Sequence, residues 1–244
     1  MKRTLYCGLM ILMSGGGLIA YVMAQQPATH TSAAEHTIQQ AQVLIREHKP
    51  LEARTVLATI PETAPEYPLA KHYDALAQHE AKDRLGFLKS IEKLPATSGL
   101  PATLSADLTV RQIEALLFYR NFEEVLPKAR AFLSQHPAAA ESAAVQDYLL
   151  AALFERGMKK TKEACNSKDE AVFNIRWPEG KADLEEFLAL AARVPHTNYL
   201  TLPKRNLSQD IYLARIVMGG GDKVLQEISA TDAAARQNIS YLRL

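Results

Sequence analysis

The feature that most constrains this 244-residue chain is a repeated spacing of apolar and proline residues. Two apolar residues four positions apart, followed by a proline eight positions later, occur twice: at Ala53, Leu57 and Pro65, and at Val125, Ala129 and Pro137. Apolar residues at this interval lie on one face of an α-helix, and proline does not continue a helix. The pattern therefore predicts pairs of short amphipathic helices that recur along the chain.

Residues 1–24 have the composition of a secretory signal peptide. Lys2 and Arg3 precede an uncharged run of 21 residues, which matches the charged and apolar regions of such a leader. Val22 and Ala24 supply the small or β-branched side chains expected three residues and one residue before a cleavage site. We therefore expect cleavage after Ala24 and a periplasmic or secreted protein.

The same segment can instead be an uncleaved N-terminal membrane anchor. A helix of 21 residues that rises about 1.5 Å per residue just spans a hydrocarbon core of about 30 Å. The protein would then be anchored in the inner membrane, with Lys2 and Arg3 on the cytoplasmic side. Both alternatives place the domain outside the cytoplasm, after a flexible polar tether at residues 25–32.

The net charge of the chain limits the partners that it can attract, and its cysteine count limits the disulfides that it can form. Without Lys2 and Arg3, 26 basic residues stand against 27 acidic ones, a net charge of −1 with histidine neutral. So small a charge gives no long-range attraction to nucleic acid, and we expect membrane contact only through the N-terminal segment. Cys165 is the one cysteine left after cleavage. We expect a buried or partly buried free thiol, with an intermolecular disulfide as the alternative.

The first expected helix pair resembles the tetratricopeptide repeat family. After a capping box formed by Ser32 and Glu35, the residues that carry the resemblance are Ala41 and Leu44 on the first helix and Ala53, Leu57 and Pro65 on the second. In that family such residues set the contacts between helices and the turn into the next repeat. Thr37 and Ala41 stand where the family prefers tryptophan and glycine, so the match is to a degenerate repeat.

A second copy lies 72 residues further along, about twice the family's period of about 34 residues. It is carried by Leu116, Val125, Ala129, Phe132 and Pro137, with a second capping box expected from Asn121 and Glu124. The interval leaves room for a middle repeat, whose apolar residues would be Leu69, Tyr73, Leu76, Phe87, Leu88 and Ile91. The resemblance therefore covers residues 33–156.

Residues 157–244 are expected to be a C-terminal helical extension of the same array. A helix that begins at Ala138 should end at Gly157. A strand signal at residues 172–177 and a turn at residues 178–180 interrupt the helical periodicity after it. The remaining helices are expected at residues 184–191, 207–218 and 222–229, and from residue 231 onward.

These elements predict an all-α fold, and the resemblance implies a right-handed α-α superhelix of antiparallel helix pairs. In such an array the first helices line a concave face that binds an extended or helical segment of a partner. The side chains expected on this face are Gln39, Arg46, His72, Tyr73, Gln112, Tyr119 and Tyr148. We select as partner-binding candidates Tyr73, Tyr119 and Tyr148, together with Trp177. The alternative for each tyrosine is a contact between repeats, and for Trp177 an anchor on the core.

One short motif points toward an enzyme. Residues 79–83 match the zinc-peptidase pattern except that Asp83 stands where the second histidine belongs. On one helix His79 and Asp83 would share a face, but no third ligand stands at a set distance. We therefore interpret the motif as a solvated helix face, and we expect no catalytic residue, metal or cofactor.

The sequence thus predicts an exported, non-catalytic scaffold or adaptor that binds a protein or peptide partner in the cell envelope. Two alternatives remain open. One is an enzyme on a helical scaffold, with its active site assembled from residues far apart in the sequence. The other is a structural subunit of an envelope complex, held in the membrane by an uncleaved N-terminal helix.

Overall fold

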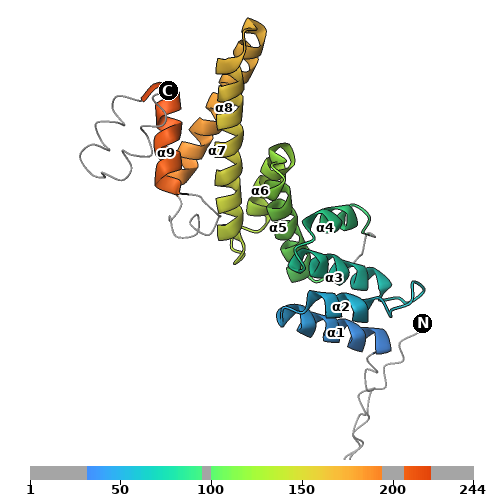
Figure 1. Cartoon of the computed structure of the whole chain (residues 1–244). Coiled ribbons are helices and arrows are strands. Elements are labelled where there is room, and N and C mark those ends of the chain that lie inside the picture. The colour runs from blue at the N-terminus through green and yellow to red at the C-terminus, as the bar shows by residue number, and fades with distance from the viewer. Residues whose placement is uncertain (1–31, 95–99, 194–205, 221–244) are drawn as a thin grey trace, which may run out of the picture.

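The computed structural model describes residues 32–94, 100–193 and 206–220. Over these ranges the protein is all-α, as expected, and contains no strand. The described part forms nine α-helices, which Figure 1 shows in chain order along an elongated molecule. They are α1 (Ala33–Arg46), α2 (Pro50–Leu57), α3 (Tyr67–Glu80), α4 (Arg84–Ile91), α5 (Ala102–Phe118), α6 (Phe122–Gln135), α7 (Ser142–Asn166), α8 (Glu170–Ala191) and α9 (Leu207–Arg215), followed by the π-helical turn η2 (Ile216–Gly220).

The helices pack mainly against their neighbours in the sequence. The pairs α1/α2, α3/α4, α5/α6 and α7/α8 each form a helical hairpin, and the second helix of each pair also contacts the first helix of the next. In addition, the first helices contact one another in succession, from α1 to α3, α5, α7 and α9. Each pair therefore buries its apolar side on the adjacent pairs, which gives the fold a repeat-like organisation.

The same left-handed turn ends the first helix of three successive pairs. His48, Lys82 and Arg120 have φ angles of 59°, 65° and 58°. In each turn this residue's N–H donates to the carbonyl three residues earlier, and the next N–H donates to the carbonyl five residues earlier. This is the Schellman arrangement, which satisfies carbonyl groups at a helix end. The three turn residues lie 34 and 38 residues apart.

Counting from these turns identifies structurally equivalent core positions. Five residues after the turn stand Ala53, Phe87 and Val125, and seven residues before it stand Ala41, Ala75 and Ile113; all six are completely buried. The apolar residues from which helix pairs were predicted, including Leu57 and Ala129, are therefore core residues. A completely buried alanine, such as Ala41, leaves no room for a larger side chain between the helices.

The structure corrects the prediction for residues 157–180. Helix α7 continues through Gly157 to Asn166, and α8 is helical through the expected strand and turn. The two glycines face each other across the hairpin: a Cβ built on Gly157 would lie 3.1 Å from the carbonyl oxygen of Gly180, and one built on Gly180 would lie 2.9 Å from that of Gly157. Here glycine permits close approach of two helices, so neither residue ends its helix.

Other local predictions had mixed outcomes. The capping box at Ser32 and Glu35 is confirmed, with both reciprocal hydrogen bonds present at 2.8 and 3.0 Å. The second box is wrong, because the Asn121 side chain donates to the Glu124 carboxylate at 2.7 Å instead of capping the helix. Cys165 is exposed, not buried as expected.

Several expectations lie outside the described residues. They concern the signal peptide or anchor, nearly all of the tether, and the elements predicted after residue 220.

Candidate binding groove

A groove of about 570 Å³ crosses the first helices of the first three pairs. Its walls combine aliphatic, aromatic and charged side chains, which suits recognition of a polypeptide better than of a purely apolar ligand. The lining residues are Gln42, Ile45 and Arg46 from α1, His48 from the turn after it, Tyr73, Leu76 and Glu80 from α3, and Asp107 and Arg111 from α5.

The repeat itself places these side chains on one face. Relative to its own left-handed turn, each polar or aromatic lining residue on the three helices stands two, six, nine or thirteen residues earlier. Steps of three and four residues follow one stripe of an α-helix. Arg46 and Glu80, for example, both stand two residues before the turn, so neighbouring repeats present side chains from equivalent positions to the groove.

Arg111 forms ion pairs with several carboxylates at the α5 end of the groove. The guanidinium lies 3.2 Å from Asp107, 3.3 Å from Glu80 and 3.8 Å from Glu114, measured between nitrogen and oxygen atoms. Glu80 belongs to α3 and the other two carboxylates to α5. Arg111 therefore joins two successive first helices through charged contacts, which are stronger than neutral hydrogen bonds.

Two titratable groups of the groove have shifted pKa values. The pKa of Asp107 is raised: burial is the largest cause, the nearby carboxylates of Glu80 and Glu141 add to it, and Arg111 opposes it. Burial also raises the pKa of the Tyr73 hydroxyl, which is hydrogen-bonded to the side chain of Gln42. Tyr73 is therefore a neutral, half-buried aromatic residue with its polar end held in place.

The four predicted partner-binding residues do not share one surface. Tyr73 lines the groove. Tyr119 is exposed at the end of α5, where its ring meets Phe118 edge to face. Tyr148 is half-buried against the largest core cluster, and burial raises its pKa to about 12.

Trp177 lies on α8, far along the chain from the groove. It is half-buried and stacks on Phe173, with ring centroids 5.7 Å apart. Phe173 and the nearby Ile175 are exposed. The strand and turn expected around Trp177 do not form, because this segment is helical.

Among the other side chains expected on the concave face, Arg46 lines the groove, whereas Gln39 and Gln112 do not. His72 does not either, because it is 4% exposed and its Nδ1 lies 2.6 Å from the carbonyl oxygen of Pro68. Sequence reasoning missed Gln42, Glu80, Asp107 and Arg111, because their common spacing is counted from left-handed turns that are visible only in the backbone.

The motif at residues 79–83 lacks the geometry of a metal pair. Helix α3 ends at Glu80, Lys82 takes the left-handed conformation, and Asp83 caps the next helix by accepting from the Gly86 amide at 2.9 Å. His79 and Asp83 therefore do not share a helix face. Over the residues that the structure describes, no three His, Cys, Asp or Glu side chains gather in a way that could hold a metal ion.

The expectation of a solvated helix face is wrong at His79, which is buried at the junction of α3, α4 and α5. It is 1% exposed, neither ring nitrogen has a hydrogen-bond partner, and its ring meets Phe87 edge to face. Its Nε2 lies 3.5 Å from the carboxylate of Glu114. Burial lowers the pKa of His79, and the opposing attraction of Glu114 is smaller, so the imidazole is neutral near pH 7.

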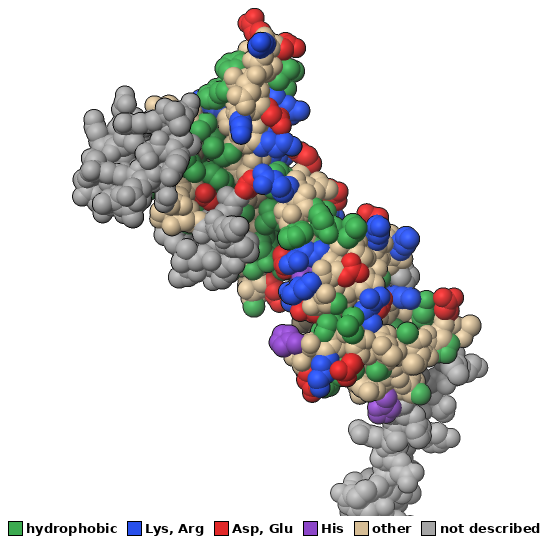
Figure 2. Space-filling model, viewed as in Figure 1, with side chains coloured by type: hydrophobic (Ala, Val, Ile, Leu, Met, Phe, Trp, Pro, Cys, Tyr) green, Lys and Arg blue, Asp and Glu red, His purple; other side chains and the backbone are tan. Residues whose placement is uncertain are grey.

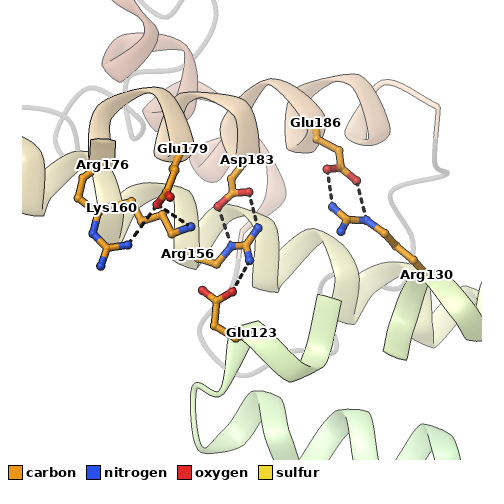
Figure 3. Close-up of polar contacts among 8 residues, drawn as sticks. All are labelled: Glu123, Arg130, Arg156, Lys160, Arg176, Glu179, Asp183 and Glu186. Atoms are coloured by element: carbon orange, nitrogen blue, oxygen red, sulfur yellow. Dashed lines mark hydrogen bonds and ion pairs between the residues drawn. The ribbon is translucent and has the colours of Figure 1, made fainter. Parts of the chain in front are cut away.

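A second polar cluster joins α6, α7 and α8 (Figure 3). Arg156 of α7 makes two hydrogen bonds of 2.7 Å to Asp183 of α8 and one of 2.8 Å to Glu123 of α6. Figure 3 also shows Lys160 and Arg176 directed at Glu179, and Arg130 paired with Glu186. Because each of these cations has a carboxylate partner, we interpret the cluster as a structural connection between helices.

No helix in the described ranges is both long enough and apolar enough to cross a bilayer. On the face of the molecule that Figure 2 shows, acidic and basic side chains are interspersed. Comparison of the chain with models of known protein families, with curated protein sequences and with solved structures finds no significant match.

Proposed function

We propose that this protein is a non-catalytic adaptor or scaffold that binds an extended segment of a protein or peptide partner in the groove across α1, α3 and α5. The observation that carries the proposal is the groove itself, in which three successive repeats present equivalent stripes of side chains. A polypeptide laid across the repeats would contact one stripe after another. Extended recognition surfaces of this kind are typical of helical repeat proteins.

The repeat geometry supports the further proposal that the array is a degenerate relative of tetratricopeptide repeats and winds into a right-handed superhelix. The left-handed turns at His48 and Lys82 are 34 residues apart, which equals that family's period. The interval to Arg120 is four residues longer, and the helix that precedes this last turn has 17 residues where its two counterparts have 14.

We also propose that the protein acts in the periplasm or at the cell surface, because of the composition of residues 1–24. N-terminal sequencing of the protein from its native cell tests this. A chain that begins at Gln25 supports an exported adaptor. A membrane-bound chain that retains Met1 supports the anchored structural subunit instead.

Site-specific photo-cross-linking in the native cell tests binding in the groove. A benzoylphenylalanine at Ile45 replaces an aliphatic residue of the groove, and the matched control places it at Thr55, which is exposed on α2. We expect one adduct of defined mass from Ile45 and none from Thr55, with the cross-linked segment of the partner identified by mass spectrometry. Equal adducts from both positions, or none from Ile45, would contradict the proposal.

A further inference from the structure

Charge is unevenly distributed between the two ends of the groove. At the α1 end, Arg46 is exposed and forms no ion pair with any described residue. At the α5 end, three carboxylates, Glu80, Asp107 and Glu114, surround the single guanidinium of Arg111. The groove therefore has a cationic end and an end where acidic groups predominate.

Other groups around the α5 end do not remove this predominance. Arg84 of α4 pairs with Glu114 at 3.2 Å, on the opposite oxygen from the one nearest Arg111. Glu141, which precedes α7, adds a further carboxylate close enough to raise the pKa of Asp107, and it has no cationic partner among the described residues. Four carboxylates thus stand against two guanidinium groups.

His79 does not change this balance of charge. Its buried ring points at Glu114 with both nitrogens lacking a hydrogen-bond partner, and it is neutral near pH 7. It therefore adds no positive charge to the cluster. Because a partly buried carboxylate that lacks full compensation is costly, a cation brought by a ligand would be favoured here.

The groove also has an apolar part between its two charged ends. Ile45 and Leu76 line it beside Tyr73, which is neutral and half-buried. A long basic side chain combines an aliphatic stem with a charged end, and it can lie along such a surface while its charge reaches the acidic groups.

We propose that the segment bound in the groove presents a lysine or arginine to Asp107 and Glu80, with a neighbouring apolar side chain against Ile45 and Leu76. The inference rests on the proposed function, because it names the chemistry of the partner for that same groove. The positive charge of Arg46 disfavours the same cation at the α1 end and so gives the bound segment a direction.

Fluorescence anisotropy with three synthetic peptides tests the inference on the purified exported protein. The peptides are fluorescein-labelled Gly-Ser-Leu-Lys-Ser-Leu-Lys-Ser-Gly and two counterparts in which glutamine or glutamate replaces both lysines. We expect the lysine peptide to bind about tenfold more tightly than the glutamine peptide, and the glutamate peptide to bind most weakly. The difference should shrink as the salt concentration rises from about 50 mM to about 500 mM.

Single-residue variants test which carboxylates cause the preference for the lysine peptide. Asp107→Asn and Glu80→Gln should each reduce the preference for lysine over glutamine to about twofold or less, while the affinity for the glutamine peptide is unchanged. The matched control is Glu92→Gln, because Glu92 is exposed at the end of α4 and does not line the groove; it should keep the full preference. The preference compares two peptides on the same variant. A less stable variant would bind both peptides less well, so its lower stability would not by itself change the preference.

Equal affinity for the lysine and glutamine peptides, or tighter binding of the glutamate peptide, would overturn the inference and leave groove binding intact. Absence of binding by the lysine peptide would also overturn it. In that case the adduct from benzoylphenylalanine at Ile45 shows whether the proposed function fails as well.

Discussion

Gly157 and Gly180 lie backbone to backbone where α7 packs on α8. A Cβ on Gly180 would stand 2.8 Å from the Thr161 amide nitrogen and 2.9 Å from the carbonyl oxygen of Gly157. Backbone atoms of two long helices cannot move aside as a flexible side chain can. The two helices can therefore lie this close only because neither glycine has a side chain.

This contact reverses the usual effect of alanine in a helix. Gly180→Ala should lower the free energy of unfolding by about 2 kcal/mol, because the clash exceeds the gain of about 1 kcal/mol in helix propensity. Urea unfolding followed by circular dichroism measures the change. Ala182→Gly, at an exposed position of α8, serves as a control and should lose about 1 kcal/mol from propensity alone. A more stable Gly180→Ala protein would show that the helices are not in close contact there.

The ion pairs of Figure 3 differ in burial and should differ in their contribution to stability. The side chains of Arg156 and Asp183 are 16% and 7% exposed, whereas those of Arg130 and Glu186 are 45% and 43% exposed. Arg156→Met should destabilise the protein by about 3 kcal/mol, because Asp183 is left buried without its partner. Arg130→Met should cost less than about 1 kcal/mol. Similar losses in the two variants, measured by urea unfolding, would contradict this assignment.

His79 should make the protein less stable in weak acid. Burial holds its folded-state pKa below the value of about 6.5 expected in the unfolded chain. The unfolded state therefore binds the proton first, and stability falls as the pH drops below about 6.5. His79→Leu places an aliphatic residue where the equivalent positions hold Ile45 and Leu117. Its unfolding free energy should change less between pH 7 and pH 5 than that of the wild type, and an unchanged slope would exclude His79 as the cause.

Asp147 should have the opposite pH dependence. It is 2% exposed, one carboxylate oxygen has no hydrogen-bond partner, and burial raises its pKa to about 6. Because the unfolded value is about 3.9, the unfolded state releases its proton first and stability falls as the pH rises from about 4 to 6. Asp147→Asn should therefore stabilise the protein at pH 7, by about 2 kcal/mol, and have little effect at pH 4. A variant that is equally affected at both pH values would contradict the charge argument.

The periodic part of the fold could be predicted from the sequence because it depends on local spacing. Residues such as Ala53, Leu57 and Ala129 lie one helical turn from other apolar residues, and the same spacing buries them against neighbouring helices. The turns between helices left no such signal. His48, Lys82 and Arg120 adopt a conformation that usually indicates glycine or asparagine, so their equivalence is visible only in the backbone.

Tertiary packing decided the features that were predicted wrongly. Gly157 and Pro178 are helix breakers by local preference, yet both lie inside long helices. Gly157 lies where α7 closely approaches α8, and the same hairpin buries Leu184 and Phe187. Tertiary packing also gives the chosen tyrosines different surroundings. A tyrosine's helix can be predicted from its surroundings in sequence, but only the neighbouring repeats determine whether it faces a groove, as Tyr73 does, or a core, as Tyr148 does.

The central claim is that the groove, and not another surface, binds the partner. The segment identified by cross-linking at Ile45 can be synthesised as a labelled peptide, and its affinity measured for the wild-type protein, Tyr73→Ala and Trp177→Ala. We predict that Tyr73→Ala weakens binding about tenfold or more, because a half-buried aromatic anchor of the groove is lost, and that Trp177→Ala binds as the wild type does. Loss of affinity in Trp177→Ala with none in Tyr73→Ala would place the partner on α8 and contradict the account.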